Sequence, residues 1–134
     1  AARRARKLVS TVRAIEPLGE ASVPLDALVS SATDEGERYA AGELEPSPAF
    51  VVRTAGASGG EVTAANGRTS RWKAAPLPGP MVDSYGAGDS FAAGLTYALG
   101  EGRSVEDALA LAARAGAACM TGRGPYEGQL RTAV

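Results

Sequence analysis

Residues 82–91 of the chain read VDSYGAGDSF, a stretch in which Gly86 and Gly88 flank Ala87 and Asp89 follows directly. An apolar helical pattern begins immediately behind Asp89. Glycines permit unusual backbone angles and let a ligand approach the main chain closely. Because the first N–H groups of a helix point outward and carry partial positive charge, this junction of loop and helix predicts an anion site.

Asp89 places a negative charge beside the predicted anion site, which is unexpected. A carboxylate would repel a resting phosphate, so its presence points to a chemical task. The task that fits is general base: Asp89 accepts a proton from an attacking hydroxyl while the N–H groups hold the phosphoryl group in transfer. In the alternative, the GAGD segment is only a turn and Asp89 caps the helix. These four residues alone do not separate the two interpretations.

Two helices are expected after the junction. The first ends near Gly100 and Gly102, and its apolar face is formed by Phe91, Leu95, Ala98 and Leu99. Ser104 opens an S-x-x-D variant of the capping box, so a second helix is predicted from there to about Cys119. Its many alanines predict close packing against a sheet or another helix.

The chain before the junction has the pattern of an α/β fold. Strands are predicted over residues 8–12, 25–32 and 50–54, with a hairpin of 61–65 and 69–74 around the two-residue turn signal Asn66-Gly67. A short helix is expected within residues 33–44, with Asp34, Glu35 and Glu37 in its first turn. Prolines between positions 76 and 80 predict an extended segment there.

Composition limits the function classes. The 134 residues carry a net charge of −1, which argues against general binding to nucleic acid or anionic membranes. The short basic cluster Arg3, Arg4, Arg6 and Lys7 is interpreted as a solvated terminus. A single cysteine fits a reducing compartment, and no apolar run reaches the roughly 18 residues of a membrane span. We therefore expect a soluble, cytoplasmic protein.

Three other residues have simple interpretations. Cys119 is expected to be a small buried residue and not a nucleophile, because the chain has no histidine to activate it. Trp72 is read as a packing residue of the hairpin. For Arg123, contact with a nucleotide and a solvated loop position are both open.

Several segments together resemble the ribokinase-like (PfkB) family of carbohydrate kinases. DSYGAGDSFAAG, from Asp83 onward, is similar to the family signature D-T-x-G-A-G-D-x-F, with Ser84 in place of threonine. TAGASG, residues 54–59, looks like the T-x-G-x-x-G segment beside the nucleotide. DEGE, residues 34–37, is similar to N-x-x-E with Asp34 replacing asparagine, and the alanine-rich helix with Thr121–Gly124 resembles the helix and loop that pass the adenine.

The resemblance implies roles for individual residues. Asp89 would be the catalytic base, and the anion hole would be formed by Gly86, Ala87 and Gly88. The residues along the phosphates and ribose of ATP would be Thr54, Gly56 and Gly59. Glu37 would act through water on Mg²⁺, with the substitution at Asp34 leaving this contact in doubt. A monovalent cation such as K⁺ would be held by Asp83 and by the carbonyl groups of Tyr85, Cys119 and Gly124.

The resemblance also implies the fold and the activity. The expected fold is a three-layer α/β/α sandwich, of which residues 1–134 form the C-terminal nucleotide-binding and catalytic part, with the N-terminal substrate and lid part absent. The expected function is ATP-dependent phosphoryl transfer to a hydroxyl of a sugar or sugar-like alcohol, with a sugar or nucleoside as partner. A homodimer is left open. The alternative is a non-catalytic nucleotide-binding or regulatory remnant, which Asp89 argues against, since a pure binder gains nothing from a carboxylate beside phosphate.

Overall fold

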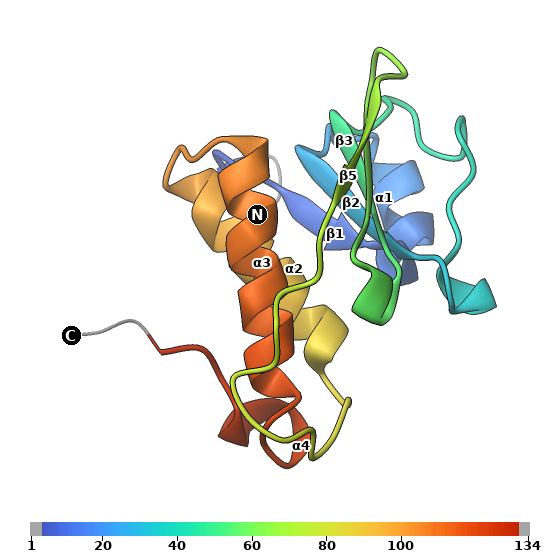
Figure 1. Ribbon diagram of the computed structural model, residues 1–134. Coiled ribbons are helices and arrows are strands. Elements are labelled where there is room, and N and C mark those ends of the chain that lie inside the picture. The colour runs from blue at the N-terminus through green and yellow to red at the C-terminus, as the bar shows by residue number, and fades with distance from the viewer. Residues whose placement is uncertain (1–3, 132–134) are drawn as a thin grey trace. The chain divides into compact units, whose positions relative to one another are not determined.

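The computed structural model describes residues 4–131, so Arg3 of the basic cluster lies outside the described residues. The chain forms two compact units, Ala1–Trp72 and Lys73–Val134. Together they give a mixed α/β fold that contains a five-stranded open sheet and helices (Figure 1). Within residues 4–131, no helix combines the length and the apolar character that a membrane crossing requires.

The first unit is built on the sheet, whose strands follow one another in chain order. Its strands are β1 (Val9–Thr11), β2 (Ala27–Ser31), β3 (Phe50–Thr54), β4 (Gly60–Ala64) and β5 (Thr69–Trp72). The first three are parallel, while β4 and β5 return antiparallel as a hairpin. The predicted strands are therefore confirmed. The register aligns Val29, Val52 and Val62 across β2, β3 and β4, and all three are buried.

The parallel pair β1 and β2 requires a crossover, and α1 (Ile15–Ala21) provides it after the 3₁₀ turn η2 (Val12–Ala14). The sequence pattern does not predict α1, which contains Pro17 and Gly19. Pro17 is the third residue of the helix, where a backbone N–H has no intrahelical partner in any case. The apolar side of α1 packs on a core cluster formed by Val12, Leu25, Leu28 and Leu44, with Leu8, Ile15, Leu18 and Tyr39 against it.

The helix predicted within residues 33–44 is wrong. Only one 3₁₀ turn forms there, η3 (Glu35–Glu37), and Asp34 caps it by accepting a hydrogen bond from the Gly36 N–H at 2.9 Å. Arg38 then continues in an extended conformation, and Gly42 has a φ of +95°. Gly36 and Gly42 both weaken a helix, since glycine is among the poorest helix formers. The acidic residues therefore form a capped 3₁₀ turn that does not continue into a helix.

The hairpin lies where predicted, but its turn differs. The Gly67 N–H donates to the Ala64 carbonyl at 2.9 Å, and the Ala64 N–H donates to the Arg68 carbonyl at 2.8 Å. Ala65 and Asn66 are therefore the central residues of the turn, and Gly67 follows them with a φ of +85°. This is the longer hairpin loop with a glycine in the left-handed region, and not the two-residue loop that Asn-Gly predicts.

The second unit is a pair of packed helices, α2 (Ala87–Gly100) and α3 (Val105–Cys119), followed by the short α4 (Gly124–Glu127). Both predicted helices are confirmed, and Figure 1 shows α2 and α3 side by side. A Cβ atom added to Gly94 would lie 3.0 Å from the Ala115 Cβ, so the small residues do allow close packing. The Ser104 hydroxyl accepts the Asp107 N–H at 3.1 Å, as the capping box predicts.

Candidate active site

The loop before α2 is held by its own backbone and by Asp83. Oδ1 of Asp83 accepts the Tyr85 N–H at 3.0 Å, and the Ser84 carbonyl accepts the Ala87 N–H at 3.2 Å. Gly86 is the N-cap of α2, with φ +84° and ψ 0°. The tight turn of residues 83–86 therefore ends directly at the first turn of the helix.

The two glycines of this segment differ in their surroundings. A Cβ atom on Gly86 would lie 2.5 Å from the Pro125 Cβ, whereas a Cβ atom on Gly88 would meet nothing within 4 Å. Gly86 uses the conformational freedom of glycine, whereas Gly88 lies within α2, which already begins at Ala87. Gly86 therefore serves the fold, while Gly88 leaves open space beside the helix start.

The N-terminus of α2 has free donors. The first bond back to the cap runs from the Ser90 N–H to the Gly86 carbonyl at 2.9 Å. No side chain of the described residues caps the helix, and the N–H groups of Gly88 and Asp89 have no acceptor among residues 4–131. Donors of this kind, at the positive end of a helix, are suited to binding an anion.

Asp89 is an exposed residue of the first turn of α2. Gly86, and not Asp89, occupies the cap position, so the interpretation of Asp89 as a helix cap is wrong. Its carboxylate lies in solvent, one residue after the open position at Gly88. The side chain is thus available for a reaction at the helix terminus.

Asp83 also ties this loop to the loop after α3. Oδ2 of Asp83 accepts the Gly124 N–H at 3.0 Å, and the Val82 and Asp83 N–H groups donate to the Met120 carbonyl at 2.8 and 3.3 Å. The hydrogen bonds from the Tyr85 and Gly124 N–H groups hold the pKa of the Asp83 carboxyl below its usual value, although desolvation opposes them. Asp83 is therefore a negatively charged junction between two loops.

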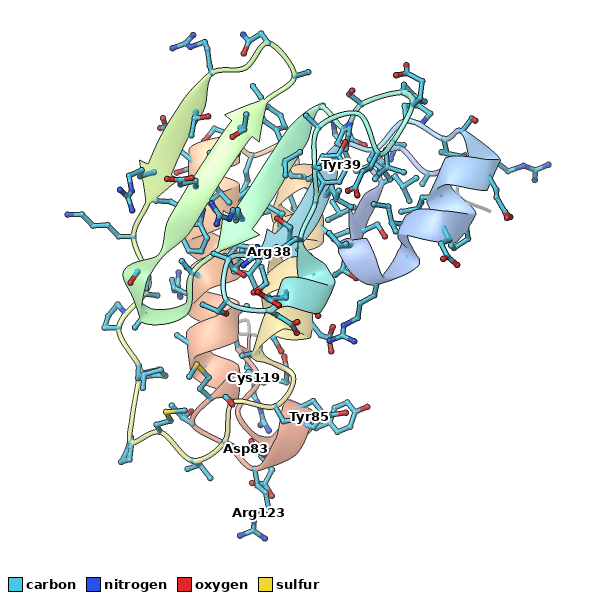
Figure 2. The ribbon with its side chains drawn as sticks, turned by 90° about the vertical axis from the view of Figure 1, so that its right-hand side faces the viewer. Arg38, Tyr39, Asp83, Tyr85, Cys119 and Arg123 are labelled. Carbon is cyan, nitrogen blue, oxygen red and sulfur yellow. The ribbon has the colours of Figure 1, made fainter. Side chains whose placement is uncertain are left out.

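Cys119 completes this junction from the end of α3. The thiol is buried, and its S–H donates to the carbonyl oxygens of Tyr85 at 3.6 Å and Pro125 at 4.0 Å. The interpretation as a small buried residue is confirmed. The structure thus brings together Asp83, Tyr85, Cys119 and Gly124, the four predicted ligands of a monovalent cation. Figure 2 shows Arg123 pointing away from them.

In the first unit, the predicted nucleotide residues share the turn between β3 and β4. Thr54 ends β3 and its hydroxyl donates to the Ser30 carbonyl at 3.2 Å. Gly56 opens the 3₁₀ turn η4 (Gly56–Ser58), and Gly59 follows it, with φ values of +55° and +80°. The Ala55 N–H donates to the Gly59 carbonyl at 2.7 Å and closes the turn. The structure therefore places Thr54, Gly56 and Gly59 in one short, glycine-dependent loop.

Glu37 has a partner that the sequence did not reveal. The Arg13 Nε atom lies 2.5 Å from Oε1 of Glu37, and its Nη2 atom lies 3.9 Å from Oδ2 of Asp34. One guanidinium therefore balances two of the three acidic residues of the DEGE segment, Asp34 and Glu37. Within residues 4–131, no group of three or more acidic, histidine or cysteine residues could enclose a metal ion. Glu37 suits Mg²⁺ only in the usual manner, in which one or two carboxylates act together with substrate phosphates and water.

The family follows from comparison with known proteins. Residues 24–133 match the model of the pfkB family carbohydrate kinases, and the chain belongs to that family. A comparison with curated proteins finds no significant match.

Solved structures agree with the family. A protein from E. coli described as ribokinase II is 30% identical over 80% of this chain and 36% of its own, with a TM-score of 0.63 in its apo form. It is also solved in complex with ATP and Mg²⁺. A ribokinase from Thermotoga maritima is 22% identical, with a TM-score of 0.71 over 96% of this chain and 48% of its own. A nucleoside kinase from Burkholderia thailandensis, solved with inosine, is 20% identical, with a TM-score of 0.70 over 96% of this chain and 54% of its own.

The chain therefore spans between about a third and about a half of the length of these three kinases. The E. coli protein is the one of these three whose identity reaches 30%. The two more distant structures support the α/β fold alone.

Proposed function

We propose that residues 1–134 form the C-terminal, nucleotide-binding and catalytic part of an ATP-dependent kinase that phosphorylates a hydroxyl of a sugar or sugar-like alcohol, nucleosides included. The observation that carries this proposal is the start of α2. There, uncapped N–H groups, open space at Gly88 and the exposed Asp89 carboxylate occur within one helical turn. Family membership supports the reaction class.

The proposed chemistry uses this turn directly. Asp89 accepts the proton of the substrate hydroxyl as the hydroxyl oxygen bonds to the γ-phosphorus and the bond to the leaving ADP oxygen breaks. In the proposed anion hole of Gly86, Ala87 and Gly88, the free Gly88 N–H, together with that of Asp89, stabilises the negative charge on the transferring phosphoryl group, while the Ala87 N–H donates to the Ser84 carbonyl and holds the turn. Because both groups belong to one helix terminus, the backbone keeps the base within one helical turn of the anion hole.

ATP supplies the phosphoryl group, and Mg²⁺ supplies neutralising charge on its phosphates. The relative solved with ATP and Mg²⁺ supports both cofactors. The nucleotide contacts of this chain are assigned to Thr54, Gly56 and Gly59, and the contact to Mg²⁺, through water, to Glu37. Glu37 must then exchange its ion pair with Arg13 for the hydrated cation.

A monovalent cation fits the junction around Asp83 in its chemistry. A charged carboxylate and the carbonyl groups of Tyr85, Cys119 and Gly124 are hard oxygen ligands of the kind that such cations take. Hydrogen bonds from Tyr85 and Gly124 to Asp83, and from Cys119 to Tyr85, support this proposal by drawing the four residues together. K⁺ dependence of the activity and the cytoplasmic location stay predictions, and a homodimer is left open.

The non-catalytic remnant is the alternative function. It would conserve the helix start as a phosphate site, yet it has no use for an exposed carboxylate there. The decisive experiment uses the complete polypeptide that carries residues 1–134, with ATP and a panel of sugars and nucleosides, and product detection by mass spectrometry. We expect one substrate class to be phosphorylated.

The matched variant is Asp89→Asn, which retains the shape of the side chain. Loss of a general base lowers kcat by about 10²–10⁴-fold, and we expect the affinity for an ATP analogue to remain. ATP binding without turnover in the wild-type polypeptide would establish the remnant instead. Near-normal kcat for Asp89→Asn would remove Asp89 from the mechanism.

A further inference from the structure

Gln129 connects the C-terminal segment to the start of α2. Its Nε2 atom donates to the Ser90 hydroxyl oxygen at 2.9 Å, and the same atom donates to the Pro125 carbonyl. Ser90 is buried and directly follows Asp89. One amide group therefore uses its two N–H bonds to join the helix of the candidate base to the segment of α4.

Pro125 is the second part of this connection. Its ring occupies the space beside Gly86, where a Cβ atom would come within 2.5 Å of the Pro125 Cβ and 3.0 Å of its Cα. Gly86 is the cap of α2 and accepts the Ser90 N–H. Gln129 is thus hydrogen-bonded both to Pro125, which packs against Gly86, and to Ser90, whose N–H donates to the Gly86 carbonyl.

The segment that carries Gln129 is itself fixed by close contacts. A Cβ atom on Gly128 would lie 2.3 Å from the Ala118 carbonyl oxygen, and one on Gly122 would lie 2.2 Å from the Gly128 nitrogen. The Arg123 N–H also donates to the Glu127 carboxylate at 2.8 Å, which closes α4 on itself. The backbone that leads to Gln129 therefore lies close to the end of α3, at a distance that only glycine allows.

We propose that Gln129 is a positioning residue for the anion hole, acting through Ser90 and Pro125, an inference that rests on the proposed kinase function. It touches neither the phosphate nor the base. Its role is to prevent the first turn of α2 from moving relative to the Gly86 cap. A misplacement of about 1 Å in reacting groups can lower a rate by about 10²-fold. We therefore expect loss of Gln129 to lower kcat by about 10- to 100-fold.

The test uses the complete polypeptide and a substrate that the wild type phosphorylates. Gln129→Ala removes the whole amide, while Gln129→Glu retains the length of the side chain but has no N–H donors. Both should show the lowered kcat, with a melting temperature near that of the wild type because Gln129 is exposed. Arg131→Ala, which shortens an exposed side chain two residues further on, is the control and should retain normal kcat.

A double-mutant cycle tests the route through Ser90. Ser90→Ala removes the acceptor on α2, so the double variant Ser90→Ala/Gln129→Ala should lose no more activity than the more impaired single variant. Independent, multiplicative losses would overturn the coupling. Wild-type kcat in Gln129→Glu would overturn the need for the two N–H donors.

Hydrogen exchange separates this inference from the proposed function. In Gln129→Ala, the Ala87 and Ser90 amides, which are hydrogen-bonded at the start of α2, should exchange faster than in the wild type, whereas the amides near the end of α2 should not change. If the wild type transfers no phosphate, the kinase proposal is wrong, yet the exchange measurement still shows whether Gln129 holds the helix. If the wild type is active, and exchange and kcat are both normal in Gln129→Ala, the positioning role alone is wrong.

Discussion

Gly86 and Gly88 allow a matched pair of substitutions with opposite expected effects on stability. In Gly86→Ala, the new side chain must adopt a φ of +84°, which costs about 1–2 kcal/mol for an L-residue. Its Cβ also falls 2.5 Å from the Pro125 Cβ, well inside the usual carbon–carbon separation of about 3.5–4.0 Å. Overpacking of this kind typically adds about 1–3 kcal/mol. The expected destabilisation is therefore about 2–5 kcal/mol.

Gly88→Ala adds the same methyl group two residues further on. This position is helical and its Cβ would meet nothing within 4 Å, so neither strain nor a clash arises. Alanine is favoured over glycine in helices by about 0.8–1.0 kcal/mol, although the effect is smaller in a first turn. We expect Gly88→Ala to be as stable as the wild type or slightly more stable.

Urea unfolding of the complete polypeptide measures both effects. With an m-value of about 2 kcal/mol/M, Gly86→Ala should lower the midpoint by about 1–2.5 M, while Gly88→Ala should leave it unchanged or raise it. The same Gly88→Ala protein should lose at least about 10-fold in kcat/KM for ATP, because its methyl group occupies the space proposed for the phosphate. Equal midpoints for the two variants would refute the steric argument. A fully active Gly88→Ala would show that no ligand uses the open space.

Three further predictions follow from single contacts. The hydrogen bonds that lower the pKa of Asp83 stabilise the folded protein above the pKa of the unfolded chain, near 3.8, and this stabilisation is lost as the pH falls through the lower pKa of the folded state. The melting temperature of Asp83→Asn should therefore lie below that of the wild type at neutral pH, and the difference between the two should shrink below about pH 4. Arg13→Gln should lower the KM for Mg²⁺ by about 1.4- to 5-fold, since an exposed ion pair contributes about 0.2–1 kcal/mol; an unchanged or higher KM would argue against Glu37 as the residue that contacts hydrated Mg²⁺. Gly60→Ala should destabilise the hairpin, because its Cβ would lie 2.2 Å from the Arg53 carbonyl oxygen and 2.5 Å from the Trp72 ring; urea unfolding with a wild-type midpoint would contradict this packing.

The parts of the fold that sequence predicted are those with a local signal. A hydrophobic pattern within the element's own residues marks the three parallel strands, around Val9, Leu28 and Val52. It also marks the two helices, near Asp89 and after Ser104. The helix prediction failed after Asp34, where the same local sequence is compatible with two structures. The acidic turn at Asp34 can open a helix or close a single 3₁₀ turn, and only the following glycines and the extended Arg38 decide it.

The candidate site divides in the same way. Gly86, Gly88 and Asp89 are neighbours in the sequence, so one stretch predicts a loop, a helix start and a carboxylate together. The contacts that support them are distant in sequence: Gln129 and Ser90 are 39 positions apart, and Arg13 and Glu37 are 24 apart. Neither pair has a periodic or compositional signal, because each depends on how two segments meet after folding. A single sequence offers no means of finding such pairs.

Other residues at the start of α2 would make the helix more stable than the residues present there. This difference bears on the choice between an enzyme and a non-catalytic remnant. Alanine at position 88 would add up to about 1 kcal/mol, since the structure shows neither positive φ nor a steric barrier there. A capping side chain at position 86 would add a few tenths of a kcal/mol to the stability of the helix, but the left-handed backbone at Gly86 and the contact with Pro125 exclude such a side chain. Packing therefore accounts for Gly86 but not for Gly88, and the folding role open to Asp89 is the modest one of a negative charge in the first turn of a helix. A phosphate site alone would account for the missing Cβ at position 88 but not for a negative charge beside it. The proposed phosphoryl transfer needs both a close approach to the backbone and a proton acceptor, so it gives Gly88 and Asp89 a common reason to lie side by side at this helix start.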